Sequence, residues 1–174
     1  MKTQKPKDIG ITAKQFRNIA KLSVGVRSGV PPSTFNIKEF YLSADEEAKN
    51  PCDVSYECGA SACFLGYGPK LGIKENIDGT WWDYARHNFT NTDTWASNIL
   101  TTEVDNLFNM LFEVTHKNCP IAAARRGAYL LLHGTPKGDR LEHWETPSSF
   151  RPHWNVIRQI ANSTCRQIEK GIEY

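Results

Sequence analysis

Residues 12–24 read TAKQFRNIAKLSV, and this stretch decides the fold class. Its apolar side chains recur at helical spacing and form one stripe: Phe16, Ile19, Ala20 and Val24. Thr12 and Gln15 have the spacing of a capping box, which satisfies free amides at a helix N-terminus. A helix stop follows, made by Gly25, Gly29, Pro31 and Pro32. The stretch therefore predicts an amphipathic helix with one buried face.

Three more helices follow from similar patterns. The first has an apolar stripe at Val104, Leu107, Phe108, Leu111 and Phe112. The second runs over 121–133, because Pro120 suits a first helical position and Gly134 suits the residue after the last one. The third runs over 154–170, with an inner stripe at Trp154, Ile157, Ala161, Thr164 and Ile168. Small residues over 58–66 predict a further short buried helix.

The expected architecture is one mainly α domain, residues 1–174, of five or six helices. A long wrapped loop covers 25–57, and a short aromatic arm covers 76–89 as either a small hairpin or a turn of helix. Apolar residues make up 40% and charged residues 23% of the chain, which excludes a disordered, collagen-like or coiled-coil protein. No apolar run reaches the roughly 18 residues of a membrane span.

Cysteine usage and the start of the chain bear on location. The five cysteines are odd in number, and the first residues, MKTQKPKDIG, lack the apolar core of a signal peptide. A disulfide framework is therefore not expected, and we predict a cytoplasmic protein.

Charge is nearly balanced overall, at +2, but it is unevenly placed. Residues 1–30 hold seven basic residues and one acidic residue, whereas 38–57 hold six acidic and two basic ones. Lys14, Arg17 and Lys21 recur at helical spacing on one face. That face is either an ordinary solvated surface or a binding surface for an acidic protein or a nucleic acid.

The aromatic arm offers a second candidate binding surface at Trp81, Trp82 and Tyr84. Adjacent tryptophans point in different directions in a strand or a helix, so one can pack on the core while the other lies at the surface. An exposed tryptophan would be an interface anchor, because Trp and Tyr dominate binding hot spots. The alternative is that the group covers the core.

The run from Cys58 to Cys63 is the feature closest to a catalytic motif. Its cysteines are separated by four residues, not by the two of papain-like proteases, and too little chain follows for the distant histidine. Apolar neighbours of Cys63 predict a buried, unreactive thiol. A weak alternative is an anion site on amides of Gly59, Ala60 and Ser61 at a helix N-terminus. No second tight pair of ligands accompanies the cysteines, so no metal site, cofactor or catalytic residue is predicted.

The chain resembles a loose group of small bacterial and phage proteins. The resemblance lies in the segments 35–40, 57–66, 107–108, 122–126 and 133–136. It is strongest in Glu57-Cys-Gly-Ala-Ser-Ala-Cys-Phe-Leu-Gly66, which fits a Cys-Gly-x-x-x-Cys-x-x-Gly core. The group has no known activity and assigns no catalytic residue. The resemblance implies a cytosolic protein of a bacterium or bacteriophage, with antagonism of host defence or other host machinery as one option.

Two functions remain open at this point. The leading one is a non-enzymatic binding or accessory protein that acts through protein–protein contact, with a protein partner favoured over nucleic acid and no membrane. The other is a small enzyme or nucleotide-binding protein with a pocket near Cys58–Tyr67. A polar cavity beside Ser61 would favour the second function, and a solid segment there would favour the first.

Overall fold

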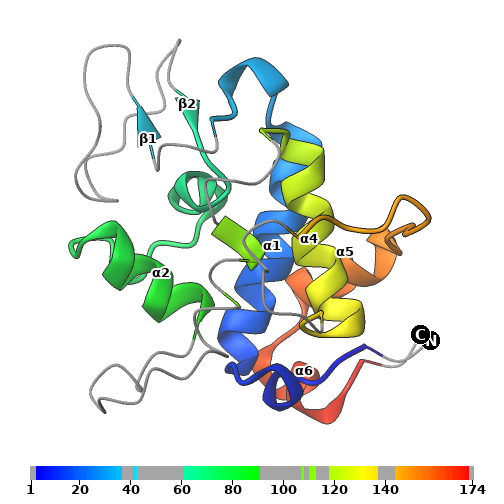
Figure 1. Ribbon diagram of the computed structural model, residues 1–174. Coiled ribbons are helices and arrows are strands. Elements are labelled where there is room, and N and C mark those ends of the chain that lie inside the picture. Colours follow the sequence, from blue (N-terminus) through cyan, green and yellow to red (C-terminus); the bar gives the residue numbers. More distant parts are fainter. Residues whose placement is uncertain are drawn as a thin grey trace.

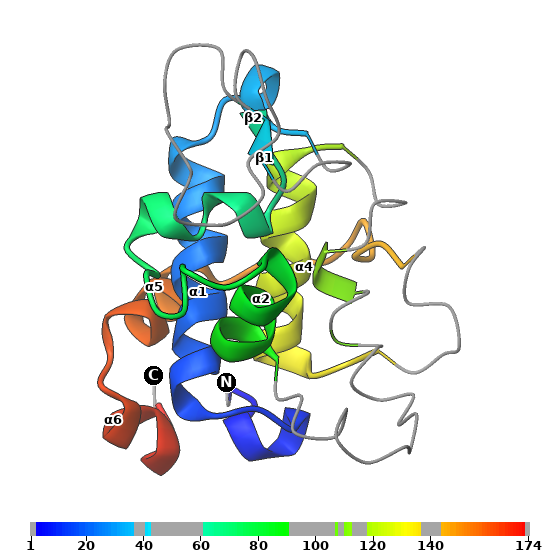
Figure 2. The same ribbon diagram turned by 90° about the vertical axis from the view of Figure 1, so that its left-hand side faces the viewer.

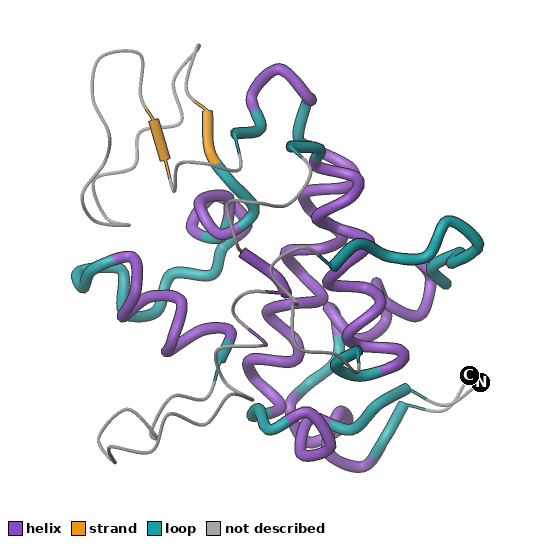
Figure 3. The backbone as a smooth tube through the Cα atoms, in the orientation of Figure 1, coloured by secondary structure: helices purple, strands orange, loops and turns teal. Residues whose placement is uncertain are grey.

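The computed structural model describes residues 3–36, 41–42, 61–90, 107, 110–112, 118–136 and 144–172. The protein is mainly helical, as the sequence predicts (Figures 1 and 3). The α-helices are α1 (Ala13–Gly29), α2 (Trp81–Phe89), α4 (Pro120–His133), α5 (Trp154–Asn162) and α6 (Cys165–Lys170). Short 3₁₀ helices are η1 (Pro6–Ile9), η2 (Pro32–Thr34), η4 (Leu65–Tyr67) and η5 (Pro69–Leu71).

Helix α1 is the centre of the fold, and α2, α4, α5 and α6 all pack against it. It begins as predicted: the Thr12 side chain accepts from the Gln15 amide, and the Gln15 side chain accepts from the Thr12 amide. It continues to Gly29, so the first part of the expected loop over 25–57 is helical instead. Gly25 does not end the helix because it serves packing. A Cβ at this position would collide with the Leu71 side chain.

Helices α1 and α4 run side by side (Figure 2). Gly127 on α4 lies against Ser23 on α1, so closely that a Cβ on Gly127 would collide with the Ser23 hydroxyl. Ser23 is held there because its Oγ donates to the Ile19 carbonyl at 2.8 Å. This contact brings the two helices together beside the core residues Ile19 and Phe64. The end of α4 follows the sequence pattern, with Gly134 at φ 81°.

The aromatic arm over 76–89 is a helix and not a hairpin from Trp81 onward. Helix α2 begins with a capping box between Thr80 and Asp83 and ends at Phe89. The described β structure is one antiparallel pair, β1 (Tyr41–Leu42) with β2 (Ser61–Ala62). The helix expected over 58–66 is therefore wrong in its described part, because 61–62 are extended and only Leu65–Tyr67 form a 3₁₀ turn.

The helix expected over 154–170 is two helices. Ser163 and Thr164 interrupt it, and Thr164 caps α6 by accepting from the Gln167 amide. Thr164 therefore belongs to a cap and not to the inner stripe, whereas Ile157, Ala161 and Ile168 are buried as predicted. Of the stripe expected over 104–112, Leu107, Leu111 and Phe112 are helical and buried; Val104 and Phe108 lie outside the described residues.

Candidate functional site

One residue of the basic face predicted on α1, Lys14, is engaged inside the molecule. Lys14 forms an ion pair with Glu75, and its Nζ lies 3.4 Å from Nε2 of His87, which in turn lies 3.2 Å from Glu75 Oε2. Arg17 is half-buried and its Nε is fully buried. Lys21 is half-buried as well. The three cations share a helix side, but Lys14 contributes chiefly to the contact between α1 and the segment that precedes α2.

Two of the three aromatic candidates, Trp81 and Tyr84, cover the core, which is the alternative prediction for this group, so neither is an exposed interface anchor. Both side chains are buried, and their rings meet edge to face at 5.7 Å. The Tyr84 hydroxyl donates to the Ile73 carbonyl at 2.6 Å. Trp82 belongs to α2, but its side chain lies outside the described part of the structure.

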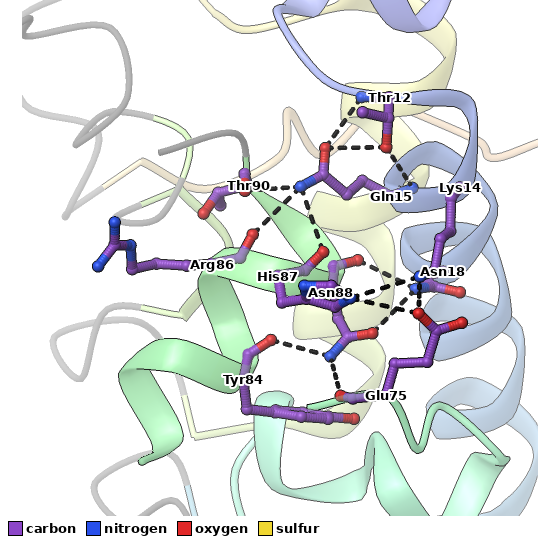
Figure 4. Close-up of polar contacts among 10 residues, drawn as sticks. All are labelled: Thr12, Lys14, Gln15, Asn18, Glu75, Tyr84, Arg86, His87, Asn88 and Thr90. Atoms are coloured by element: carbon purple, nitrogen blue, oxygen red, sulfur yellow. Dashed lines mark hydrogen bonds and ion pairs between the residues drawn. The ribbon is translucent and has the colours of Figure 1, made fainter. Parts of the chain in front are cut away.

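A buried amide network joins α1 to the end of α2 (Figure 4). Gln15 Nε2 donates to the carbonyls of Arg86, His87 and Thr90 at 3.1, 3.4 and 2.7 Å. These carbonyls lie at the C-terminal end of the helix, where no further turn supplies amide donors. Gln15 therefore caps α2 from a different element. This role is structural, and the spacing of residues along the chain does not reveal it.

Asn18 and Asn88 extend the same network. Asn18 Nδ2 donates to the Asn88 carbonyl at 3.1 Å, and Asn88 Nδ2 donates to the carbonyls of Glu75 and Tyr84 at 2.7 and 3.0 Å. Both asparagines are buried. The network satisfies backbone groups that would otherwise be buried without partners, which would cost stability.

The cysteine-rich segment behaves as core where it is described. Cys63 is buried, as predicted, and burial raises the pKa of its thiol to about 11. Phe64 and Leu65 beside it are also fully buried. Ser61 lies in β2, so it does not begin a helix and the basis for the anion site fails at that residue. Gly59 and Ala60 lie outside the described residues.

Arg125 and Arg126 on α4 hold the segment that precedes α5. Arg125 donates to Thr146 Oγ1 at 3.1 Å and to the carbonyls of Pro147 and Phe150, each at 2.9 Å. Arg126 is fully buried, and its Nη1 lies 3.2 Å from Glu145 Oε1. Neither role is predictable from the sequence, because an Arg-Arg pair in a helix is usually solvated.

Tyr129, on the turn of α4 after Arg125, packs against two aromatic rings of the same segment. Tyr129 lies 4.7 Å from Trp144 and 5.1 Å from Phe150, measured between ring centroids. The 144–150 segment is therefore fixed on α4 by both hydrogen bonds and aromatic packing.

Four exposed cations lie at the end of α1 and on α5 and α6. Arg27, at the end of α1, stacks over the ring of Trp154 with its Cζ 4.5 Å from the centroid. Arg158 lies on the next turn of α5 and is exposed. Arg166 and Lys170 are exposed one turn apart on α6. We call Arg27, Arg158, Arg166 and Lys170 the cationic side. Within 151–172 the sequence holds one acidic residue, Glu169.

Neither the described side chains nor comparison with known proteins assigns a function to this chain. Among the described ranges, no three histidine, cysteine, aspartate or glutamate side chains gather as a group that could hold a metal ion. In the same part of the chain, no helix combines the length and apolar character required to cross a bilayer. No family model, no curated protein and no solved structure matches this chain.

Proposed function

We propose that this chain is a non-enzymatic binding protein whose cationic side receives an acidic surface of another protein. The observation that carries the proposal is the exposure of Arg27, Arg158, Arg166 and Lys170 on helices that pack on the same central helix. A surface rich in one sign of charge attracts a partner of the opposite sign and suppresses partners of the same sign.

The stacking of Arg27 on Trp154 supports this choice of surface. The ring holds the guanidinium beside α5, where Arg158 follows one turn later. A positioned guanidinium loses less conformational freedom when it binds a carboxylate, and its planar donors fit two carboxylate oxygens at once. Arginine and tryptophan are also the residues that most often dominate protein–protein interfaces.

The basic face expected at Lys14, Arg17 and Lys21 is not the centre of this proposal, because Lys14 is already paired with Glu75. The resemblance to small bacterial and phage proteins implies that the partner belongs to the machinery of a bacterial host. This remains a prediction.

A charge-reversal experiment tests the proposal. The test variant carries Arg158→Glu, Arg166→Glu and Lys170→Glu. The matched control makes the same change of net charge at three exposed lysines elsewhere: Lys7→Glu, Lys70→Glu and Lys74→Glu. Exposed charges contribute about 0–1 kcal/mol each to folding, so both variants should keep the fold.

Each form is tagged and used to capture proteins from nuclease-treated lysate of the source cells, and captured candidates are then purified. The proposal requires an acidic protein that wild type and control retain and the test variant loses. Its affinity, measured by titration, should fall at least 10-fold in the test variant and should weaken between about 50 and 300 mM salt, because added salt screens exposed charges. Equal retention by the test variant, or capture that succeeds only from lysate not treated with nuclease, would contradict the proposal.

A further inference from the structure

Arg27 and Trp154 form a contact at one end of the cationic side. Arg27 lies on the last turn of α1, and Trp154 is the first residue of α5. The Cζ atom of Arg27 lies 4.5 Å from the centroid of the indole ring. Trp154 is half-buried and packs against the hydrophobic core, whereas Arg27 is exposed. The core therefore holds the ring, and the ring in turn limits where the guanidinium can lie.

The guanidinium of Arg27 has no acidic partner within the described part of the chain. None of the ion pairs found there involves Arg27, and its guanidinium makes no hydrogen bond to another described residue. A cation that is held in place and unpaired can bind a carboxylate from outside. The planar donors of an arginine fit two carboxylate oxygens at once.

Arg158 brings a second guanidinium to the same turn of α5. It follows Trp154 by one turn, and residues at this spacing lie on the same side of a helix. Its Nη1 lies 3.4 Å from Oδ1 of Asn155, the residue after Trp154, so its guanidinium lies back over the first turn of α5. Arg27 therefore meets this turn through Trp154, and Arg158 meets it through Asn155.

A ligand that matches this arrangement needs two chemical properties. It needs a carboxylate for the guanidinium groups. It also needs an apolar side chain, because the exposed part of the Trp154 ring is stabilised when a partner removes it from water. An acidic surface without apolar side chains offers only the carboxylate. A segment in which acidic and aromatic residues alternate offers both within a short length of chain.

We infer that the partner of the cationic side binds through a segment in which acidic and aromatic residues alternate. A carboxylate of this segment binds Arg27, and a neighbouring aromatic ring packs against Trp154, which also positions Arg27. The inference rests on the proposed function and specifies the partner. Net charge attracts many acidic proteins, whereas the arginine–tryptophan pair selects among them by the apolar neighbour of the carboxylate.

Two synthetic peptides of equal length and equal charge test the inference. In the first, glutamate alternates with phenylalanine; in the second, serine replaces every phenylalanine. Each peptide carries a dye, and its fluorescence anisotropy is followed as purified protein is added at about 50 mM salt, where exposed charges are only partly screened. We expect wild type to bind the phenylalanine peptide at least about 10-fold more tightly, because only this peptide can cover the Trp154 ring.

Two lysine variants separate geometry from charge. Arg27→Lys keeps the positive charge but loses the planar donors and the stacking on the ring, so binding of the phenylalanine peptide should weaken by about 5-fold or more. Arg86→Lys makes the same exchange on α2, outside the cationic side, and is the matched control. It should change the affinity by less than about 2-fold.

Variants of Trp154 test the role of the ring. Trp154→Leu keeps an apolar side chain against the core but removes the indole, so the ratio between the two peptides should fall to about 3-fold or less. Trp154→Phe keeps an aromatic ring and should restore part of the ratio. Circular dichroism must show that each variant is folded. If Trp154→Leu does not fold, the comparison of Arg27→Lys with Arg86→Lys decides.

Three results would overturn the inference: a ratio near unity or no binding in wild type, equal effects of Arg27→Lys and Arg86→Lys, or an unchanged ratio in folded Trp154→Leu. Capture from lysate judges the proposed function separately. An acidic protein that the charge-reversal variant loses, together with a peptide ratio near unity, would leave the proposed function standing and remove this inference.

Discussion

The side-chain Nε2 of Gln15 lies 2.7 Å from the Thr90 carbonyl oxygen. The two residues are far apart in the sequence and lie on either side of the α1–α2 contact. The same nitrogen reaches the carbonyls of Arg86 and His87. One side chain of α1 therefore closes the C-terminal end of α2.

Replacement of Gln15 should destabilise the fold well beyond the loss of one surface contact. Gln15→Met keeps the length of the side chain but leaves buried carbonyls without a donor and removes the acceptor for the Thr12 amide. We expect the free energy of unfolding to fall by about 2–3 kcal/mol in urea titrations. Gln159→Met, at an exposed position of α5, is the matched control and should change it by less than about 0.5 kcal/mol. A similar loss in both variants would contradict the capping role.

The contact between α1 and α4 predicts a steric penalty at Gly127. Gly127→Ala inserts a methyl group against the Ser23 hydroxyl, and overpacking of this kind costs about 1–3 kcal/mol. Ser23→Ala in the same chain removes the colliding oxygen and should restore most of the loss, as a double-mutant cycle by thermal or urea unfolding can measure. Gly29→Ala is the control, since its Cβ would meet nothing within 4 Å. Additive effects at positions 23 and 127 would show that the two residues do not constrain each other.

The buried thiol of Cys63 predicts a pH dependence of stability. Its pKa rises from 9.0 to about 11 in the folded protein, so the unfolded chain releases this proton first as the pH rises. The corresponding stability is present below pH 9 and is lost between pH 9 and about 11, by up to about 2 kcal/mol. Cys63→Ala lacks this titration, so its free energy of unfolding should decline less steeply across that window. Parallel curves for both proteins would be the contrary result.

Arg125 should determine how firmly the 144–150 segment is held. Arg125→Lys keeps the positive charge but cannot reproduce the three hydrogen bonds of the planar guanidinium. We expect faster amide hydrogen exchange at Phe150, whose amide donates to the Pro147 carbonyl at 2.9 Å, with little change in the exchange of α1. Arg158→Lys on the exposed face of α5 is the comparison variant. Unchanged exchange at Phe150 would mean that aromatic packing alone fixes the segment.

The parts of the fold that the sequence predicts are those with local signals. The helix at 13–29 has its capping box at Thr12 and Gln15, and the helix at 120–133 has proline at its start and glycine after its end. The break between α5 and α6 also had a local signal, the pair Thr164 and Gln167 at capping-box spacing. It was missed because Thr164 falls on the apolar stripe, where a cap and a stripe residue coincide.

The candidate site was less predictable, because its roles depend on partners distant in the sequence. The sequence around Lys14 does not indicate its ion pair with Glu75. The burial of Trp81 and Tyr84 depends on how α2 packs against the rest of the protein. The predicted anion site at Ser61 required a helix to begin there. The small residues over 58–66 indicated such a helix, but Ser61 lies in β2 and pairs with β1 instead. Cys63 was predictable, since its immediate neighbours are themselves core residues.

The close approach of Ser23 and Gly127 has a consequence for how this sequence can evolve. A larger residue fits at position 127 only after position 23 has lost its hydroxyl. That change also removes the hydrogen bond from Ser23 to the Ile19 carbonyl, so it has a cost of its own. The two positions should therefore vary together among descendants of this chain, with small residues retained at one whenever the other grows. Such covariation would identify the contact between α1 and α4 in any set of relatives, independently of what the protein binds.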